Sequence, residues 1–316
     1  MPATQPEWTF DRPFPALTAA QRYHFDLYGY VVIENTLTLD EVTACRQALY
    51  DLRESLRKLD DPGHDGPRHH NAYLNEAADG HHSYLSHILE SHPTLTAYAT
   101  HPRLVGMAEE IIGGDARIVE MNAQINRKAP TWPTDDRGRP TFGLHRGASP
   151  HSGMHTRQGL VHCNFVKTLT NLTDLGPDDG GTVVVAGSHK IDLPAGELIA
   201  AAYEDRALLH QVVAPAGSTL LFAETLLHAT GQIRSDTERV ILICGYGTRL
   251  FPYWDHGKLS DDFVARIPPQ LYTLFHGWPN WVPGHRYRQL ADAVDDRPFA
   301  MGRWDDRVAV KSADRP

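Results

Sequence analysis

The pattern of hydrophobic and polar positions predicts helices at the start of the chain. From Leu17 it indicates a helix, a short strand and a second helix. Thr18 can cap the first helix, and the β-branched and aromatic run at 30–33 favours a strand. Thr38 and Glu41 have the spacing of a capping box at the start of a long amphipathic helix.

A change of pattern near residue 115 separates these helices from a region of short strands. Residues 60–82 are rich in Pro, Gly, Asp and His and are expected to form a loop, and a further helix is expected over 102–112. Short apolar stretches bounded by Pro, Gly and Asp then follow, and we expect strands at 116–126, 160–173, 182–186, 212–213, 218–222 and 239–247. Many short strands without regularly alternating helices indicate an all-β sandwich or barrel.

The composition of the chain argues against a nucleic-acid-binding protein, a membrane protein and a disulfide-rich secreted protein. The formal net charge of −9 argues against binding to a nucleic-acid polymer, which relies on clustered Lys and Arg. No run of about 18 apolar residues and no signal-like segment is present, so we expect neither a membrane span nor secretion. The 3 cysteines form no CxxC pair, which is typical of a cytoplasmic protein without a disulfide framework.

His228 and Arg239 form the clearest chemical pattern in the chain. His228 follows the apolar stretch 218–222 after a short connection, and Arg239 opens the next expected strand. An imidazole in such a position can hold a metal ion, and a guanidinium on a neighbouring strand can bind a carboxylate through two charge-assisted hydrogen bonds.

Three segments resemble the phytanoyl-CoA dioxygenase family, in the family's order, over most of residues 17–249. They are FDLYGYVVIENTLTLDEV, the central DGGTVVVAGSHK, and the pair His228 and Arg239. The resemblance implies a mainly β fold with a double-stranded β-helix core, a jelly roll of the cupin kind. We expect one domain over 1–316, with N-terminal helices at about 17–115, the core at about 116–250 and a C-terminal lid at about 251–316.

The same resemblance implies a non-haem Fe(II) enzyme that uses 2-oxoglutarate and O2. It implies that His228 is a metal ligand and that Arg239 anchors 2-oxoglutarate. Gln124 and Thr230 match family positions that line the 2-oxoglutarate pocket.

The first ligand motif departs from the family pattern. The H-x-D motif of the family is matched by His145-Arg146-Gly147, so that glycine stands in the place of the acid. The metal is then one negative charge short, and an anion is favoured beside it. The sequence resembles in this respect the 2-oxoglutarate-dependent halogenases, which implies chloride beside Gly147 and chlorination of an unactivated C–H bond.

Other histidines near this motif are alternative ligands. His151, His155 and His162 lie close in sequence, but His162 falls within an apolar strand, where a buried structural role is favoured. We expect a structural role for His189 as well.

The main substrate is expected to be a small molecule of natural-product biosynthesis. Basic residues near the expected pocket mouth suit a small phosphorylated or heteroaromatic ligand. The resemblance to H-x-G halogenases that act on nucleotides in nucleoside-antibiotic biosynthesis implies a nucleotide such as deoxyadenosine monophosphate. The candidates are Arg127, Lys128, Arg146 and Arg249, with Arg157, Lys167, Tyr253 and Trp254 as further possibilities.

Two rival functions remain open from sequence. The first is a hydroxylase of the same fold, in which Glu224, Glu120 or water fills the place of the acid. The second is a non-catalytic jelly roll that binds a small ligand.

Overall fold

The fold is described from a computed structural model. It describes residues 10–11, 17–59, 68–157, 159–248, 259–267, 271, 274–275 and 300–301. The described residues include the helical part and the expected β core, whereas most of the expected lid at 251–316 lies outside them.

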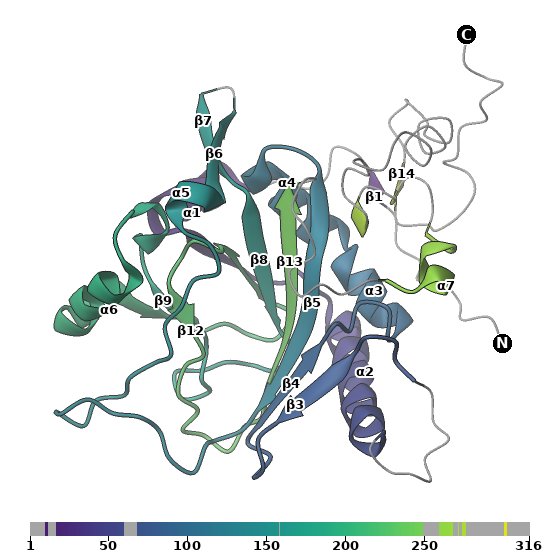
Figure 1. Ribbon diagram of the computed structural model, residues 1–316, viewed down its shortest axis with the longest axis horizontal. Coiled ribbons are helices and arrows are strands. Elements are labelled where there is room, and N and C mark those ends of the chain that lie inside the picture. Colours follow the sequence, from purple (N-terminus) through teal and green to yellow (C-terminus); the bar gives the residue numbers. More distant parts are fainter. Residues whose placement is uncertain are drawn as a thin grey trace.

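Two antiparallel sheets, one of seven strands and one of three, form the β core of the molecule (Figure 1). The large sheet has the order β2-β11-β8-β13-β5-β4-β3, and the small sheet has the order β10-β9-β12. The strands of the large sheet are β2 (Tyr30–Ile33), β3 (Tyr73–Glu76), β4 (His82–Ser86), β5 (Ala116–Asn126), β8 (Phe165–Asn171), β11 (Thr219–Ala223) and β13 (Arg239–Thr248). Those of the small sheet are β9 (Val183–Val185), β10 (Leu209–Gln211) and β12 (His228–Ala229).

Helices cover the outer face of the large sheet (Figure 1). They are α1 (Ala19–Tyr28), α2 (Leu39–Lys58), α3 (Pro93–Ala99) and α4 (Pro102–Ile112). Buried residues of α2 and α4 share one apolar cluster with the outward side chains of β5 and β13, among them Met121, Ala123, Leu242 and Cys244. Apolar burial of this kind is the main favourable term in folding, so this cluster fixes the helices on the sheet.

The remaining elements are the ten-residue helix α6 and several short segments. They are β1 (Phe10–Asp11), α5 (Pro150–Gly153), β6 (Met154–Arg157), β7 (Leu160–Cys163), η1 (Ser188–Lys190), α6 (Ala195–Glu204), η2 (Arg206–Leu208), α7 (Asp261–Val264) and β14 (Ala300–Met301). Strand β6 pairs with β7, and β1 pairs with β14. Within the described part of the chain, no helix combines the length and the apolarity that a bilayer crossing requires.

The inner face of the large sheet carries a row of polar side chains on β5. Alternation along β5 directs Glu120, Asn122, Gln124 and Asn126 away from the helices. Between the two sheets, Leu220 and Phe222 of β11 share an apolar cluster with Val184 of β9. Buried polar side chains on a face that opposes another sheet are costly unless they have partners, and here they mark the candidate site.

Both predicted N-terminal caps are confirmed. The Thr18 side chain accepts a hydrogen bond from the backbone of Gln21, and Thr38 does so from Glu41. In each case the side chain of the third helical residue also accepts from the backbone of the cap, which completes a capping box.

Thr38→Ala is expected to lower the free energy of unfolding by about 1 kcal/mol, because the long helix α2 loses the acceptor for its first-turn N–H. Urea denaturation of the full chain measures this change. Thr237→Ala is the matched control, since Thr237 is exposed in the loop before β13. Equal losses in the two variants would contradict a capping contribution.

Local predictions hold best where strands and helices carry strong signals. The strands over 30–33 and 116–126 and the helix over 102–112 match β2, β5 and α4 in both bounds. The loop predicted over 60–82 is wrong from 73 on, because β3 and the start of β4 lie there and pair as a hairpin beside β5. The strand predicted at 212–213 is also wrong, since β10 occupies 209–211, and the predicted strand 160–173 is divided into β7 and β8.

Candidate functional site

His145 and His228 lie side by side although they are far apart in sequence. The backbone N–H of His145 donates to the carbonyl oxygen of His228 at 3.0 Å, and the N–H of His228 donates back at 2.9 Å. The centroids of the two imidazole rings are 4.4 Å apart. The two histidines predicted as metal ligands are therefore brought together by one antiparallel bridge.

Both imidazoles are oriented by their own backbone. Nδ1 of His145 donates to the carbonyl of Gly143 at 2.9 Å, and Nδ1 of His228 donates to that of Leu226 at 2.9 Å. A carbonyl can only accept, so Nδ1 carries the proton and Nε2 keeps its lone pair. This is the usual arrangement behind a metal-binding histidine. Burial, with smaller effects of His145 and Lys167, lowers the pKa of His228 to about 3, so this imidazole is neutral at physiological pH.

Arg239 is a fully buried cation at the start of β13. Its Nη1 donates to Oε1 of Gln124 at 2.8 Å and its Nη2 to Oγ1 of Thr182 at 3.3 Å. Its Nε is buried without a hydrogen-bond partner among the described residues. Burial lowers the pKa of Arg239 to about 10. A buried guanidinium whose hydrogen-bond partners among the described residues are neutral oxygens is suited to an anionic ligand, such as the distal carboxylate of 2-oxoglutarate.

The other two residues predicted for the 2-oxoglutarate pocket lie beside Arg239. Oε1 of Gln124 accepts from Arg239 and also from Oγ1 of Thr230, at 3.5 Å. Thr230 lies two residues after His228, so it links the metal pair to the basic group. Thr182, which the sequence reasoning missed, completes the set from the strand region of DGGTVVV.

Gly147 lies against Glu224, so a side chain of the protein stands beside the residue where chloride was expected. A Cβ added at Gly147 would lie 2.2 Å from Oε1, 2.8 Å from Cγ and 2.9 Å from Cδ of Glu224. The backbone holds the two segments together, since N–H groups of Gly147 and Ala148 donate to the carbonyl of Glu224 at 3.1 and 3.3 Å. A carboxyl group does stand beside Gly147, but it comes from the segment after β11.

Glu224 belongs to a buried cluster of charges that we call the acid-lysine cluster, made of Glu120, Lys167 and Glu224. The ammonium of Lys167 lies 2.9 Å from Oε1 of Glu120 and 3.1 Å from Oε1 of Glu224. Asn122 donates to the other oxygen of Glu120 at 2.9 Å. Oε2 of Glu224 is buried without a hydrogen-bond partner among the described residues.

A glycine on β13 makes room for this cluster. A Cβ at Gly245 would lie 2.7 Å from Cγ of Glu120 and 2.7 Å from Cε2 of Phe165. Glu120 and Glu224 were considered from sequence as separate sources of an acid, and Lys167 as a basic residue. The sequence did not predict that these three residues form one cluster. The cluster depends on the registers of β13 with β5 and with β8, which place Gly245 opposite both Glu120 and Lys167.

Burial raises the pKa of Glu224 from 4.5 to about 7, with a further contribution from Glu120, whereas Lys167 acts in the opposite direction. The native protein therefore binds more protons than the unfolded chain between pH 4.5 and 7. The free energy of unfolding that Glu224 contributes must fall as the pH rises through this window.

Glu224→Gln is expected to flatten this pH dependence, because glutamine does not titrate. The stability of the wild type relative to the variant should fall from pH 5 to pH 7.5, by about 1.4 kcal/mol for each unit of pKa shift. Urea denaturation at the two pH values measures the difference. A relative stability of the wild type that rises with pH would contradict the raised pKa.

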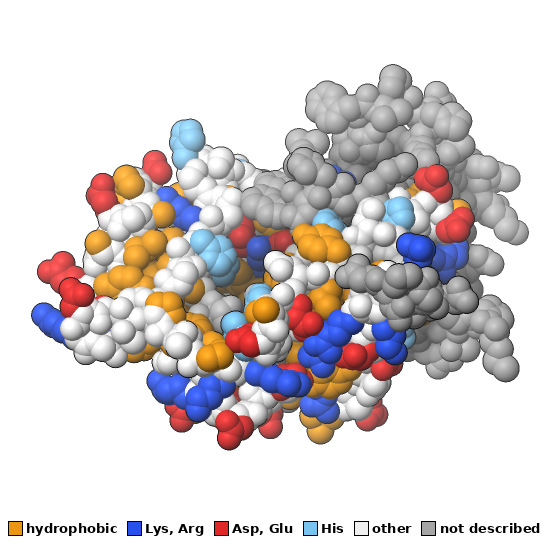
Figure 2. All heavy atoms as spheres, turned by 60° about the horizontal axis from the view of Figure 1, so that its bottom comes forward, with side chains coloured by type: hydrophobic (Ala, Val, Ile, Leu, Met, Phe, Trp, Pro, Cys, Tyr) orange, Lys and Arg blue, Asp and Glu red, His pale blue; other side chains and the backbone are white. Residues whose placement is uncertain are grey.

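The cofactor anchor and the acid-lysine cluster lie at opposite ends of one strand. Arg239 pairs with Asn126 and Gly245 pairs with Glu120, so about 20 Å of strand β13 separates them. The metal pair lies between, because Thr230 joins it to Arg239 and Gly147 joins it to Glu224. In Figure 2 acidic, basic and histidine side chains gather near the middle of the face shown.

The basic residues predicted for substrate binding are placed differently from one another. Arg127 donates to Glu238 at 3.0 Å, at the end of β5 near Arg239, and Lys128 is exposed beside it. Arg146 donates to the backbone carbonyls of Ile191 and Leu193, at 3.4 and 2.8 Å. Their roles stay predictions.

Some of the predicted substrate residues cannot be placed. Arg249, Tyr253 and Trp254 lie outside the described residues, and so does the side chain of Arg157.

The alternative histidine ligands have partners or exposure of their own. His162 is buried on β7, where Nδ1 donates to the carbonyl of Ile111 at 3.2 Å, and its ring stacks on that of His155 at 5.5 Å. His151 is exposed on α5, and His189 is buried in η1. Across the residues that the structure describes, no group of three or more His, Cys, Asp or Glu is placed to hold a metal ion.

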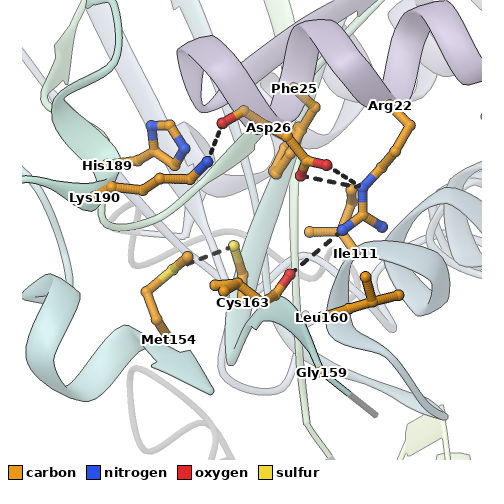
Figure 3. A pocket seen from close by; sticks show the side chains of 11 residues that line it. Arg22, Phe25, Asp26, Ile111, Met154, Gly159, Leu160, Cys163, His189 and Lys190 are labelled. Atoms are coloured by element: carbon orange, nitrogen blue, oxygen red, sulfur yellow. Dashed lines mark hydrogen bonds and ion pairs between the residues drawn. The ribbon is translucent and has the colours of Figure 1, made fainter. Parts of the chain in front are cut away.

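A cavity of about 240 Å³ lies between α1 and the β6-β7 hairpin (Figure 3). Nε of Arg22 donates to both carboxylate oxygens of Asp26 at 3.1 Å, and Lys190 donates to the backbone carbonyl of Asp26. The lining residues described for it do not include His145, His228 or Arg239. The cavity is therefore separate from the candidate metal site.

Comparison with solved structures supports the fold. HygX from Streptomyces hygroscopicus, solved with nickel and 2-oxoglutarate bound, is 24% identical, with a TM-score of 0.58 over 76% of this chain and 90% of HygX. The non-haem α-ketoglutarate-dependent carbocyclase SnoK from nogalamycin biosynthesis is 18% identical, with a TM-score of 0.54 over 79% of this chain and 91% of SnoK. The predicted jelly-roll core with N-terminal helices is thus confirmed.

Comparison of sequences identifies the family. The ectoine dioxygenase of Sphingopyxis alaskensis is 25% identical over 189 residues, which are 60% of this chain and 54% of that protein. The chain spans about half the length of the curated relatives it matches. A sequence profile of phytanoyl-CoA dioxygenase matches residues 25–241, well over half of the chain. The protein therefore belongs to the phytanoyl-CoA dioxygenase family of non-haem Fe(II)- and 2-oxoglutarate-dependent dioxygenases.

Proposed function

We propose that the protein is an Fe(II)- and 2-oxoglutarate-dependent halogenase that chlorinates an unactivated C–H bond of a small molecule. The observation that carries the proposal is the pairing of two oriented histidines with a glycine in the place of the family's acid. His145 and His228 converge, and Gly147 offers no ligand. A metal with two neutral protein ligands keeps a position for an external anion.

The residues present fit the two cofactors. Nε2 of His145 and Nε2 of His228 would hold the iron, because Nδ1 of each ring carries its proton and donates it to a backbone carbonyl. Arg239 would bind the distal carboxylate of 2-oxoglutarate, with Gln124 and Thr230 beside it. Bound iron and 2-oxoglutarate supply the oxidising chemistry, in which O2 converts 2-oxoglutarate to succinate and CO2 and a substrate C–H bond is oxidised.

The acid-lysine cluster determines the charge that an anion beside Gly147 would meet. With Glu224 protonated, the cluster of one ammonium and one carboxylate is neutral and does not repel an anion beside Gly147. The raised pKa of Glu224, about 7, favours this state at neutral and lower pH. Lys167 also contributes a positive charge next to the halide position.

Hydroxylation is the second candidate function, and Glu224 favours it. Its carboxylate oxygen lies 2.2 Å from the Cβ position of residue 147, and its Oε2 has no hydrogen-bond partner among the described residues. A rotation of the Glu224 side chain onto the metal would supply the missing acid from the segment after β11. The enzyme would then have two histidines and one carboxylate and would need no halide.

Product analysis separates these functions. The purified chain is given Fe(II), 2-oxoglutarate and O2, with or without chloride, and a panel of small molecules that includes deoxyadenosine monophosphate, the substrate class that we propose first. A chlorinated product that requires chloride supports the halogenase. Hydroxylated product alone, whatever the chloride concentration, overturns it in favour of the second function. Absence of succinate with every substrate would instead favour a non-catalytic binding protein.

A further inference from the structure

Glu224 occupies a volume that an acid at position 147 would need. The three atoms nearest to a Cβ at Gly147 all belong to Glu224, and the closest is only 2.2 Å away. Cβ atoms in proteins essentially never approach a heavy atom closer than 3.0 Å, so one of the two side chains must move. Gly143, two residues before His145, has nothing within 4 Å of its Cβ position, so the crowding is specific to residue 147.

Contacts of its side chain and of its backbone hold Glu224 in this position. Its Oε1 lies 3.1 Å from the ammonium of Lys167, which is itself held by Glu120 at 2.9 Å. Its side chain is only 2% exposed, so a movement away from Lys167 would leave a buried carboxyl group without its partner. The carbonyl of Glu224 also accepts the N–H groups of Gly147 and Ala148, which holds the two backbones in place.

We propose that Glu224, held by Lys167, is a specificity-determining residue of this site, because it excludes an acid side chain from position 147 and so keeps the metal site at two histidines. Substitution of Gly147 alone then cannot restore the family's H-x-D motif. The family motif has its carboxyl group at the position of Gly147, whereas here a carboxyl group reaches the same place from Glu224, where the ammonium of Lys167 holds it. This inference rests on His145 and His228 as metal ligands and not on the identity of the reaction.

Thermal unfolding of the full chain tests the exclusion. Gly147→Ala adds only a Cβ and is expected to lower the unfolding temperature clearly, whereas Gly143→Ala, the matched control, leaves it within about 1 °C because the added methyl group meets nothing. In the background of Glu224→Ala, the loss caused by Gly147→Ala should largely disappear. An unchanged unfolding temperature in Gly147→Ala, or an equal loss in both backgrounds, would overturn the proposal.

Metal affinity gives a second and independent test. Ni(II), which does not react with O2 here, is titrated into the wild type, Gly147→Asp, Glu224→Ala and the double variant Gly147→Asp with Glu224→Ala. We expect the double variant to bind Ni(II) at least about tenfold more tightly than the wild type, and the single Gly147→Asp variant to show no such gain. An equal gain in Gly147→Asp alone would overturn the exclusion.

The same titration distinguishes other failures. A tenfold or larger loss of Ni(II) affinity in Glu224→Ala would show that Glu224 is itself a ligand, which overturns this inference and favours hydroxylation. If the wild type bound no Ni(II), the proposed metal site would fail. The unfolding experiment would still decide whether Glu224 crowds position 147, because it needs no metal.

Discussion

Replacement of His228 by alanine is expected to abolish 2-oxoglutarate turnover and to weaken metal binding by more than about 100-fold. Removal of a hydrogen-bond partner behind a metal ligand alone costs 10–100-fold, and His228 is proposed as a ligand itself. Its ring is oriented by Leu226 and lies 4.4 Å from the ring of His145. Succinate formation and titration with Ni(II) measure the two losses, and circular dichroism verifies that the variant is folded.

His151→Ala is the matched control for this experiment. His151 is a histidine near the same motif, but it is exposed on α5. It is expected to retain the metal affinity of the wild type. If His151→Ala lost the metal and His228→Ala kept it, the metal site would have to be moved to the region of α5 and the β6-β7 hairpin.

Strands and helices with strong local signals could be predicted from the sequence. Strand β2 is a run of Tyr, Val and Ile, and α2 begins with a capping box, so that local preference and final structure agree. Strands β3 and β4 were missed because each is short and mixes polar with apolar residues, without the apolar run that predicted β2. They are strands because β3 pairs with β4 and β4 pairs with β5, at Gln124 and Ala123 among others. Such tertiary pairing leaves no local pattern to read.

The residues of the candidate site were predictable from the sequence, but the space that is free beside Gly147 was not. His145, His228, Arg239, Gln124 and Thr230 were all proposed from motifs, and the structure brings them together. The crowding of Gly147 by Glu224 could not be foreseen. It depends on the backbone contact between two segments far apart in sequence and on the direction in which Lys167 draws a flexible side chain.

The two ends of the candidate site differ in the charges that they present. At the end of Arg239, a buried cation lacks a negative partner among the described residues, so an anionic ligand completes the site. At the end of Glu224, two acids share one ammonium, so that no positive charge is left there to bind a carboxylate. Two acids sharing one cation in a buried place favour protonation of one of them, as the raised pKa of Glu224 indicates. An anionic co-substrate should therefore bind with its distal carboxylate toward Arg239 and away from Glu224.

Arg239→Met is expected to raise the KM for 2-oxoglutarate at least about 30-fold, because truncation of one partner of a buried charge pair costs about 2 kcal/mol or more. Methionine keeps much of the volume of the arginine stem and removes the charge. Steady-state succinate formation at varied 2-oxoglutarate concentration measures the change, and the affinity for Ni(II) without 2-oxoglutarate should stay within a few-fold of the wild type.

Arg234→Met is the matched control, since Arg234 precedes β13 by a few residues but is half exposed and paired with Asp178. It removes the same charge from the same part of the chain, outside the buried site. If both variants raised the KM equally, the effect would come from the overall charge of this region, and Arg239 would not be the anchor. If neither raised it, 2-oxoglutarate would have to bind elsewhere, and the buried, incompletely bonded guanidinium of Arg239 would need another anionic ligand.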